Sequence, residues 1–324
     1  MKRTDWFRNA RWGLMAHYLA IPPSATGGQG ITVAEWNEQV NSFEPKTLAA
    51  QLHVCGAHYL IITLGQNSGF FLSPNQTYDS LVKRHPSRCS KRDIISELIR
   101  ELDTFDIPLL LYLPSHAPAC DLQAVTGLSC TPEWAASKWQ LHPGTYSIGL
   151  GTDERLTTFQ RNWEAIIREW SLRWGTGIKG WWFDGCYYSD KMYEHQDEPN
   201  FGSFAAAARA GNPNSIIAFN SGVKTPVARL TEHEDYTAGE ISRALPVFDK
   251  GCPVRDNVDG SQYHLLTFAG ERWGIGPMRF GSEFVRAYTS EVNRRGGVIS
   301  WDVPISTNGL IDAEAIELFR KTAG

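Results

Sequence analysis

The stretch Lys179-Gly180-Trp181-Trp182-Phe183-Asp184-Gly185 joins a short apolar run to a carboxylate and a glycine. The run predicts a buried strand over residues 181–184, because short apolar aromatic runs next to glycine are typical of sheet cores. Asp184 then stands at the carboxyl end of a rigid strand. If that strand belongs to a β/α barrel, this end is the face on which barrel active sites lie. The alternative is that Asp184 caps a turn or the next helix.

Outward from this strand, apolar runs alternate with amphipathic segments along the whole chain. We expect strands over residues 11–18, 57–64, 107–113, 181–184 and 215–220, a sixth ending at 235–236, and two more over 267–275 and 297–301. Helices are expected over residues 45–55, 93–102, 152–174, 201–210, 284–294 and 313–320. This alternation predicts an α/β fold, a (β/α)8 barrel of the TIM type with irregular parts, formed by residues 1–324 as a single domain.

A doubly wound sheet is the competing architecture for such alternation. It would place a glycine-rich phosphate turn of the G-x-G-x-x-G type after the first strand. Here the first strand leads into His17-Tyr18-Leu19 instead. The barrel is therefore the favoured prediction.

Composition excludes several functional classes. The 324 residues carry 31 Lys and Arg against 35 Asp and Glu, and no basic stripe, so we expect no nucleic-acid partner. No apolar run approaches the roughly 20 residues of a membrane helix, so we expect no membrane partner. The amino-terminal residues lack the apolar stretch of a signal peptide, which favours a cytoplasmic location, or secretion if a leader was removed. The oligomeric state is not indicated.

Polar residues gather at the predicted carboxyl ends of the strands: His17, Gln66, Asn67, Asp184, Asn220, the acidic cluster over residues 232–240, and Asp302. In a barrel these ends share one mouth, and the long loops over residues 21–30 and 117–151 are expected to cover it. Two carboxylates that flank a bond are the equipment for glycoside cleavage. The chain also has twelve Trp, and flat apolar rings cover the C–H faces of sugars. These observations favour a carbohydrate or glycoside as the partner.

Several short motifs then resemble, in order and spacing, the catalytic barrel of the α-L-fucosidase family, glycoside hydrolase family 29. They are Trp6-Phe7 with Arg11-Trp12-Gly13-Leu14-Met15-Ala16-His17, then Glu35-Trp36, Gly56-Ala57-His58-Tyr59, Arg92-Asp93-Ile94-Ile95, Trp182-Phe183-Asp184-Gly185, Asp235-Tyr236-Thr237-Ala238-Gly239-Glu240, and Gly296-Gly297 through Asn308-Gly309. The resemblance spans nearly the whole chain. It implies a (β/α)8 catalytic domain, and we expect it without the β-sandwich domain that follows the barrel in many family members.

The resemblance also implies roles for individual residues. Asp184 would be the nucleophile of a retaining glycosidase and Glu240 its general acid/base, with Glu232 and Glu234 as alternatives for the second role. Substrate contacts would come from His17, Trp36, Gln66, Asn67, Tyr112, Trp182 and Asn220. For His17 the alternative is a buried histidine with a structural role. The resemblance implies no metal and no organic cofactor.

Departures from the family pattern affect the sugar-binding side. The family motif K-H-H-D-G-F, whose two histidines hold fucose hydroxyls, is replaced by Gly65-Gln66-Asn67-Ser68-Gly69-Phe70. The family's arginine after the fifth strand is missing from Asn220-Ser221-Gly222. Each lost partner of a buried hydroxyl costs about 1–3 kcal/mol. We therefore expect cleavage of an α-L-configured or related glycoside other than a simple fucoside.

Two other functions stay open at this stage. One is a barrel that binds carbohydrate without cleaving it, which needs the aromatic walls but no paired carboxylates. The other is a metal-dependent barrel hydrolase, which needs several converging His and Asp ligands. The first strand offers His17 alone and no H-x-H pair, so the metal-dependent reading is disfavoured.

Overall fold

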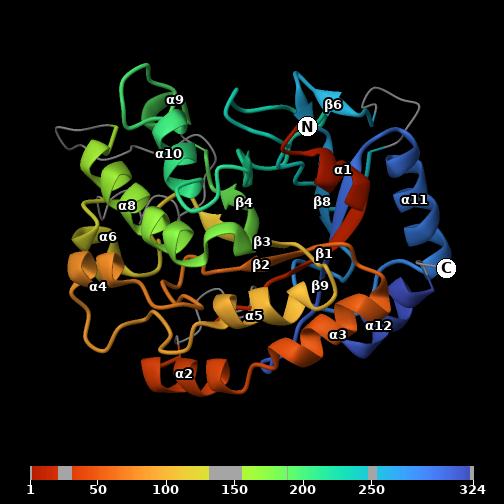
Figure 1. Ribbon diagram of the computed structural model, residues 1–324, viewed down its shortest axis with the longest axis horizontal. Helices are drawn as coiled ribbons and strands as arrows, with labels where there is room; N and C mark the ends of the chain where they lie inside the picture. Colours follow the sequence, from red (N-terminus) through yellow and green to blue (C-terminus); the bar gives the residue numbers. More distant parts are fainter. Residues whose placement is uncertain (1, 21–30, 131–154, 188, 247–253, 322–324) are drawn as a thin grey trace.

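The computed structural model describes residues 2–20, 31–130, 155–187, 189–246 and 254–321, and Figure 1 shows their arrangement. The strands are β1 (Trp12–Ala16), β2 (Leu60–Thr63), β3 (Leu109–Pro114), β4 (Ile178–Asp184), β5 (Ile216–Phe219), β6 (Asn257–Val258), β7 (Ser261–Gln262), β8 (His264–Phe268) and β9 (Val298–Val303). The helices are α1 (Asp5–Ala10), α2 (Val33–Asn41), α3 (Pro45–Cys55), α4 (Gln76–Val82), α5 (Ile94–Asp103), α6 (Leu122–Gly127), α8 (Thr157–Trp174), α9 (Ser189–Met192), α10 (Phe201–Ala208), α11 (Ser282–Arg294) and α12 (Ala313–Arg320).

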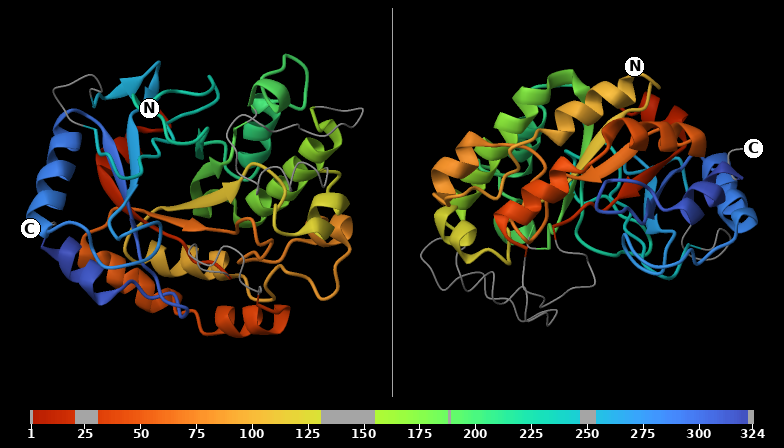
Figure 2. Two further views of the ribbon diagram at one scale, coloured as in Figure 1. Left: turned by 180° about the vertical axis from the view of Figure 1, so that it is seen from behind. Right: turned by 90° about the horizontal axis from the view of Figure 1, so that it is seen from below.

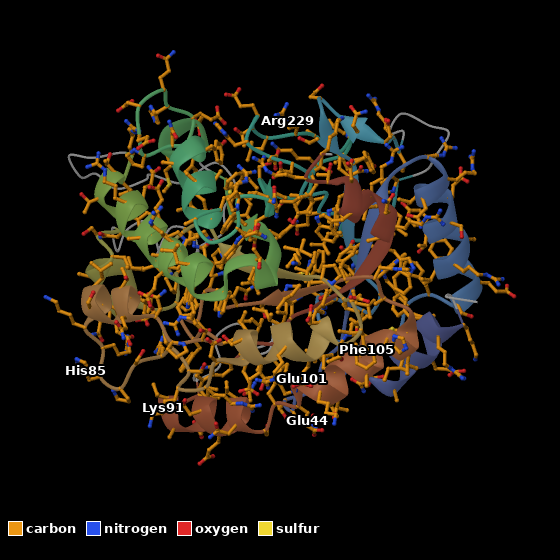
Figure 3. All side chains as sticks on the ribbon, in the orientation of Figure 1. Glu44, His85, Lys91, Glu101, Phe105 and Arg229 are labelled. Carbon is orange, nitrogen blue, oxygen red and sulfur yellow. The ribbon has the colours of Figure 1, made fainter. Side chains whose placement is uncertain are left out.

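Seven of these strands form one parallel sheet in the order β5-β4-β3-β2-β1-β9-β8. The sheet curls, and the helices lie outside it, with α8 beside α10 and α3 between α5 and α12 (Figures 1 and 2). Exposed polar side chains such as Glu44, His85 and Lys91 cover the outer surface (Figure 3). The chain is therefore an α/β barrel of the TIM type, which confirms the predicted fold class.

The side chains of each strand alternate between two apolar layers. On β4, Trp181 and Phe183 pack outward under the helices, whereas Trp182 packs into the barrel interior. The inner layer also takes Met15, Tyr59, Ile61, Leu110, Tyr112, Ile216 and Leu266. Continuing the same period of two places residue 184 on the interior side, directly above Trp182. The alternation thus directs the carboxylate of Asp184 into the mouth of the barrel.

The predicted sixth strand, ending at 235–236, does not form as a regular strand. Residues 235–241 close the barrel between β5 and β8 through isolated bridges, Tyr236 to Gln262 and Glu240 to Leu266. The Asp235 carboxylate accepts the Ile217 N–H at 2.9 Å, so a side chain takes the place of a ladder carbonyl. Gly239 has φ +62°, which breaks the extended backbone. Figure 2 shows this part of the chain as coil.

Other element boundaries also differ from the sequence prediction. The strand expected over residues 267–275 is β8 (His264–Phe268), and residues 272–275 instead form a turn bridged by Arg272 and Ile275. The helix expected from 152 begins at Thr157 in α8, and its predicted start at 152–154 lies outside the described residues. The predicted loop over 21–30 and most of that over 117–151 also lie outside them. The part of the latter up to residue 130 contains the short helix α6.

The close approach at Gly239 supplies a test of the closing segment. A methyl group at this position would lie 1.8 Å from the His264 carbonyl oxygen. Gly239→Ala should therefore lower the free energy of unfolding by about 1–3 kcal/mol more than Gly260→Ala. Gly260 is the matched control, because its φ is +93° but open space surrounds it. Urea denaturation of both variants measures the difference, and equal losses would contradict the described closure.

Candidate active site

A cavity of about 200 Å³ lies at the carboxyl ends of the strands. It is lined by Met15, His17, Gln66, Tyr112, Trp182, Asp184, Glu240, Leu266 and Trp273. Polar and apolar side chains occupy the lining together, as is usual where a small ligand binds. Six of the residues predicted from the sequence to act in the site, including both carboxylates, therefore line one cavity.

Three hydrogen-bond donors converge on the carboxylate of Asp184. The Tyr112 hydroxyl donates to its Oδ2 at 2.5 Å, and Asn220 Nδ2 and the Gly185 N–H donate to its Oδ1 at 2.9 and 2.8 Å. Gln66 Nε2 in turn donates to the Tyr112 hydroxyl at 3.2 Å. Accepting three bonds and donating none is the pattern of an ionised carboxylate. The arrangement also fixes the orientation of the carboxylate from three sides.

The side-chain amide of Asn220 joins the two acidic residues. Its Nδ2 donates to Asp184 Oδ1 at 2.9 Å and to Glu240 Oε2 at 2.6 Å. Asp184 Oδ1 and Glu240 Oε2 therefore lie no more than about 5.5 Å apart. Asn220 is buried, and its Oδ1 accepts the Gly222 N–H at 3.1 Å, which fixes the amide orientation. Asn220 was predicted to contact substrate, and the structure places it between the carboxylates.

Glu240 is held in a different electrostatic state from an ordinary surface glutamate. Burial, followed by the nearby charge of Asp184, raises the pKa of Glu240 to about 7. The hydrogen bond from Asn220 and the charge of His17 act in the opposite direction on this pKa. One member of the pair is thus suited to carry a proton near neutral pH while the other accepts hydrogen bonds.

His17 stands beside the carboxylates with a buried acid behind it. Its Nδ1 lies 2.7 Å from Asp302 Oδ1, and the Asp302 side chain is 0% exposed. Burial opposes protonation of the imidazole, but the charge and hydrogen bond of Asp302, together with the charges of Asp184 and Glu240, raise the pKa of His17. The alternative prediction of a paired, buried histidine therefore fits the Nδ1 edge of the ring, which faces Asp302. The same side chain also lines the cavity.

Aromatic rings form the apolar part of the lining. Trp182 stacks on Tyr112 with ring centroids 5.3 Å apart, and its indole N–H donates to the Ala238 carbonyl at 3.0 Å. Trp273 lies with its centroid 5.8 Å from that of His17. Sequence reasoning missed Trp273, because it placed this residue inside the expected strand over 267–275. The dipeptide Trp273-Gly274, an aromatic residue before a turn glycine, was the available signal.

Asn220 and four further candidates do not line this cavity. Trp36 is buried and donates its indole N–H to the Phe71 carbonyl at 3.4 Å, and Asn67 lies outside the lining. Glu232 is 83% exposed on its side chain. Glu234 is buried, and it accepts the N–H groups of Phe219 and Leu230 at 2.8 and 2.6 Å. Of the three glutamates considered as acid/base, Glu240 is the one beside Asp184.

Two features are absent from the part of the chain that the structure describes. In this part of the chain, no group of three or more His, Cys, Asp or Glu side chains is arranged to hold a metal ion. None of the helices described is long and apolar enough to cross a membrane.

Comparison with known proteins finds relatives by structure and none by sequence. No family model matches the chain, and no curated protein matches it. Among solved structures, an endo-fucoidan hydrolase from glycoside hydrolase family 107 is similar with TM-score 0.70 and 18% identity, over 99% of this chain and 53% of that one. The α-L-fucosidase AlfC from Lactobacillus casei has TM-score 0.62 and 16% identity, over 99% and 97% of the two chains. A bacterial fucosidase bound to an inhibitor has TM-score 0.67 and 17% identity, over 99% and 72%.

These likenesses define the class of fold. The chain has the barrel found in glycoside hydrolases that act on fucose-containing substrates, and it spans about half the length of the first neighbour. At such low identity the likeness concerns the fold alone. The structural neighbours include an α-L-fucosidase, and the sequence motifs resemble those of the α-L-fucosidase family. They also include endo-acting enzymes of a second family.

The raised pKa of Glu240 predicts a cost in stability at neutral pH. A carboxyl group with a higher pKa in the folded state stabilises the fold below its unfolded pKa of about 4.5, and that stabilisation is lost as pH rises through about 7. At pH 8, Glu240→Gln should therefore have a free energy of unfolding on the order of 1–3 kcal/mol higher than wild type, as measured by urea denaturation. The difference should be smaller at pH 4.5. Equal differences at both pH values would contradict the assignment.

Proposed function

We propose that this chain is a retaining glycosidase that cleaves an α-L-configured or related glycoside. The observation that carries the proposal is the Asn220 amide, which holds Asp184 and Glu240 within about 5.5 Å of each other. This upper limit lies below the about 6.5–9.5 Å that inverting enzymes leave for a water molecule, and it is compatible with the about 5–5.5 Å of retaining enzymes. We also propose that residues 1–324 act as one catalytic domain with no resident metal or organic cofactor.

The reaction needs two steps at the anomeric carbon. In the first, an Asp184 oxygen attacks this carbon, the glycosidic C–O bond breaks, and Glu240 gives its proton to the leaving oxygen. In the second, Glu240 takes a proton from water as the water oxygen attacks the same carbon and releases the Asp184 carboxylate. The raised pKa of Glu240 supports the role of acid, and the three donors on Asp184 support the role of an oriented nucleophile.

The lining supports a single sugar ring as the group held beside the carboxylates. A volume of about 200 Å³ is below the roughly 300–1,000 Å³ of drug-sized pockets. His17 and Gln66 offer hydrogen bonds to hydroxyl groups, and Tyr112, Trp182 and Trp273 offer apolar faces. Because Gln66 and Asn67 stand where the fucosidase family has two histidines, we propose a glycone other than simple fucose.

A barrel that binds carbohydrate without cleaving it remains the second candidate. It needs the aromatic walls and places no demand on the carboxylates. A separation above about 10 Å between the two acids would favour it over either hydrolytic geometry. The shared hydrogen-bond donor supports the catalytic alternative, because two partly buried carboxyl groups repel each other when both are ionised, and such unfavourable arrangements are typical of functional sites.

A panel of aryl glycosides tests the proposed reaction. The panel should include α- and β-glycosides of L-fucose, L-galactose, L-glucose, L-rhamnose and L-arabinose. We expect turnover of at least one glycoside other than the fucoside, and loss of about 10³-fold or more in kcat/KM for Asp184→Ala and Glu240→Ala. Azide should restore activity to Asp184→Ala with an activated substrate, because the small anion occupies the space of the deleted carboxylate.

Glu232→Ala is the matched control for that panel, since it removes an exposed acid from the same acidic cluster and should retain wild-type activity. Equal activity of wild type and Asp184→Ala would exclude the mechanism. Binding of sugars with no turnover of any member would favour the carbohydrate-binding alternative. Strong turnover of the fucoside would show that the family's two histidines are not needed for fucose.

The bridge between the carboxylates gives a separate test. Asn220→Ala removes the donor that lowers the pKa of Glu240, so the alkaline limb of kcat/KM should move to higher pH. We also expect kcat to fall about 10²-fold, as for other preorganised donors at reacting groups. Asn212→Ala is the control, because Asn212 is also buried but donates to Ile178, at the opposite end of β4. An unchanged pH profile in Asn220→Ala would contradict this role.

A further inference from the structure

Asp302 is a buried acid that the proposed reaction does not use. It stands near the end of β9, is 0% exposed, and does not line the cavity. Both of its oxygens are engaged: Oδ1 lies 2.7 Å from His17 Nδ1, and Oδ2 accepts the Gly274 N–H at 2.5 Å. One carboxylate therefore joins two pieces of the cavity wall, the end of the first strand and the turn over residues 272–275.

The turn is packed closely against the histidine. Gly274 has φ +67°, and a methyl group there would lie 2.9 Å from the His17 Cβ atom. The neighbouring Trp273 packs its ring against His17 at 5.8 Å and against Phe268 at 5.0 Å between centroids. A displacement of Asp302 would thus affect the imidazole and the indole together.

The chemistry of a carboxylate decides which nitrogen of His17 carries hydrogen. Burial raises the pKa of Asp302, whereas the charge and hydrogen bond of His17 and the Gly274 N–H act to lower it. An ionised carboxylate accepts hydrogen bonds and donates none, so beside the ionised form Nδ1 holds the proton that faces Asp302. Nε2 is then the nitrogen left for the cavity. An asparagine amide at residue 302 can present its N–H₂ group to Nδ1, which would favour the opposite tautomer.

We propose that Asp302 is a positioning residue that fixes which nitrogen of His17 faces a bound glycone and holds Trp273 against the same imidazole. The part about the glycone rests on the proposed glycosidase function. The part about the imidazole and the indole stands on the contacts of Asp302, His17 and Trp273 alone.

The charges around His17 give the pairing a further consequence. The groups that face the ring are Asp302 from β9, Asp184 from β4, Glu240 from the closing segment, and Tyr112 from β3, whose ring centroid lies 5.7 Å away. Burial lowers the pKa of His17, and the carboxylates of Asp302, Asp184 and Glu240 raise it above its ordinary value. With Asp302 in place the imidazole is held as a cation at higher pH, so that Nε2–H donates to a ligand oxygen.

Nitrogen-15 NMR of the histidine side chains tests the pairing without any substrate. The His17 signals are assigned by their absence in His17→Gln. In wild type we expect a protonated Nδ1 throughout the titration. In Asp302→Asn the midpoint should fall by about one pH unit or more, with the neutral ring protonated on Nε2. The same tautomer and the same midpoint in both proteins would overturn the proposal.

Glu234→Gln is the matched control for loss of a buried carboxylate. Glu234 also accepts backbone N–H groups, but it lies outside the cavity lining. It should lower stability and leave the His17 titration unchanged. A shift in this control as large as that of Asp302→Asn would also overturn the proposal, because it would show a general effect of loosening the fold.

Acrylamide quenching of tryptophan fluorescence tests the other contact. We expect quenching to increase in Asp302→Asn, and the increase to vanish when Trp273→Phe is added. No increase, or one that persists in the double variant, would count against the proposal. If Asp302→Asn fails to fold, both readouts are made on Gly274→Ala, which keeps the carboxylate and pushes the turn from His17. The proposal then requires both the His17 midpoint and the Trp273 quenching to change.

Kinetics separates this inference from the proposed function. If the chain is a glycosidase, Asp302→Asn should raise KM about tenfold with a smaller change in kcat, because a glycone contact is lost while Asp184 and Glu240 stay in place. Equal falls in kcat and kcat/KM would contradict the positioning role. If no glycoside is turned over, the NMR and quenching results still decide whether Asp302 holds the two rings.

Discussion

Two partly buried acidic side chains, with carboxyl oxygens no more than about 5.5 Å apart, are the constraint around which the mouth of the barrel is built. Like charges so close in a poorly solvated site cannot both ionise freely. The structure meets this by giving the two acids unequal surroundings. Asp184 receives donors from Tyr112, Asn220 and Gly185, whereas Glu240 receives one donor and keeps a pKa near 7. The two acids line the same cavity, so the difference between them comes from the hydrogen-bond donors around each carboxyl group.

The same constraint accounts for the irregular closure of the barrel. Glu240 must reach the mouth from a segment that two strands hold from opposite sides. The Trp182 indole N–H donates to the Ala238 carbonyl at 3.0 Å, and the Tyr236 hydroxyl donates to the Trp181 carbonyl at 2.9 Å. On the other side, the Ile241 N–H donates to the Leu266 carbonyl at 2.8 Å. Side chains therefore supply part of the hydrogen bonding that a regular eighth strand would make, and the backbone is free to turn at Gly239.

The sequence predicts the parts of this protein that depend on local pattern. Helices α3 and α12 have the predicted boundaries, because apolar spacing and Pro45 define them locally. The positions of Asp184 and Glu240 followed from a strand end and a family motif. What the sequence did not predict depends on tertiary contacts. The sequence of the closing segment resembles that of a strand, but the Asp235 carboxylate accepts the Ile217 N–H in place of a backbone carbonyl. Trp273 was assigned to a strand, whereas β8 ends at Phe268. The two oxygens of Asp302 bind His17, 285 residues away in the sequence, and Gly274, 28 residues away. No local sequence pattern predicts contacts at such separations.

The departures from the fucosidase motif have a physical meaning in this setting. Where that family has an imidazole, Gln66 donates to the Tyr112 hydroxyl, which in turn donates to Asp184. A hydroxyl group bound by Gln66 would therefore act on the same chain of hydrogen bonds that orients the carboxylate. After the neighbouring strand β1, His17 takes its state from Asp302, which is separate from that chain of hydrogen bonds. The two polar groups therefore act differently. Gln66 couples a ligand to Asp184 through Tyr112, whereas His17 presents a donor whose state is set by the buried Asp302. For the proposed glycosidase, a glycone whose hydroxyls match one amide and one imidazole paired with Asp302 would fit this lining better than one suited to paired imidazoles.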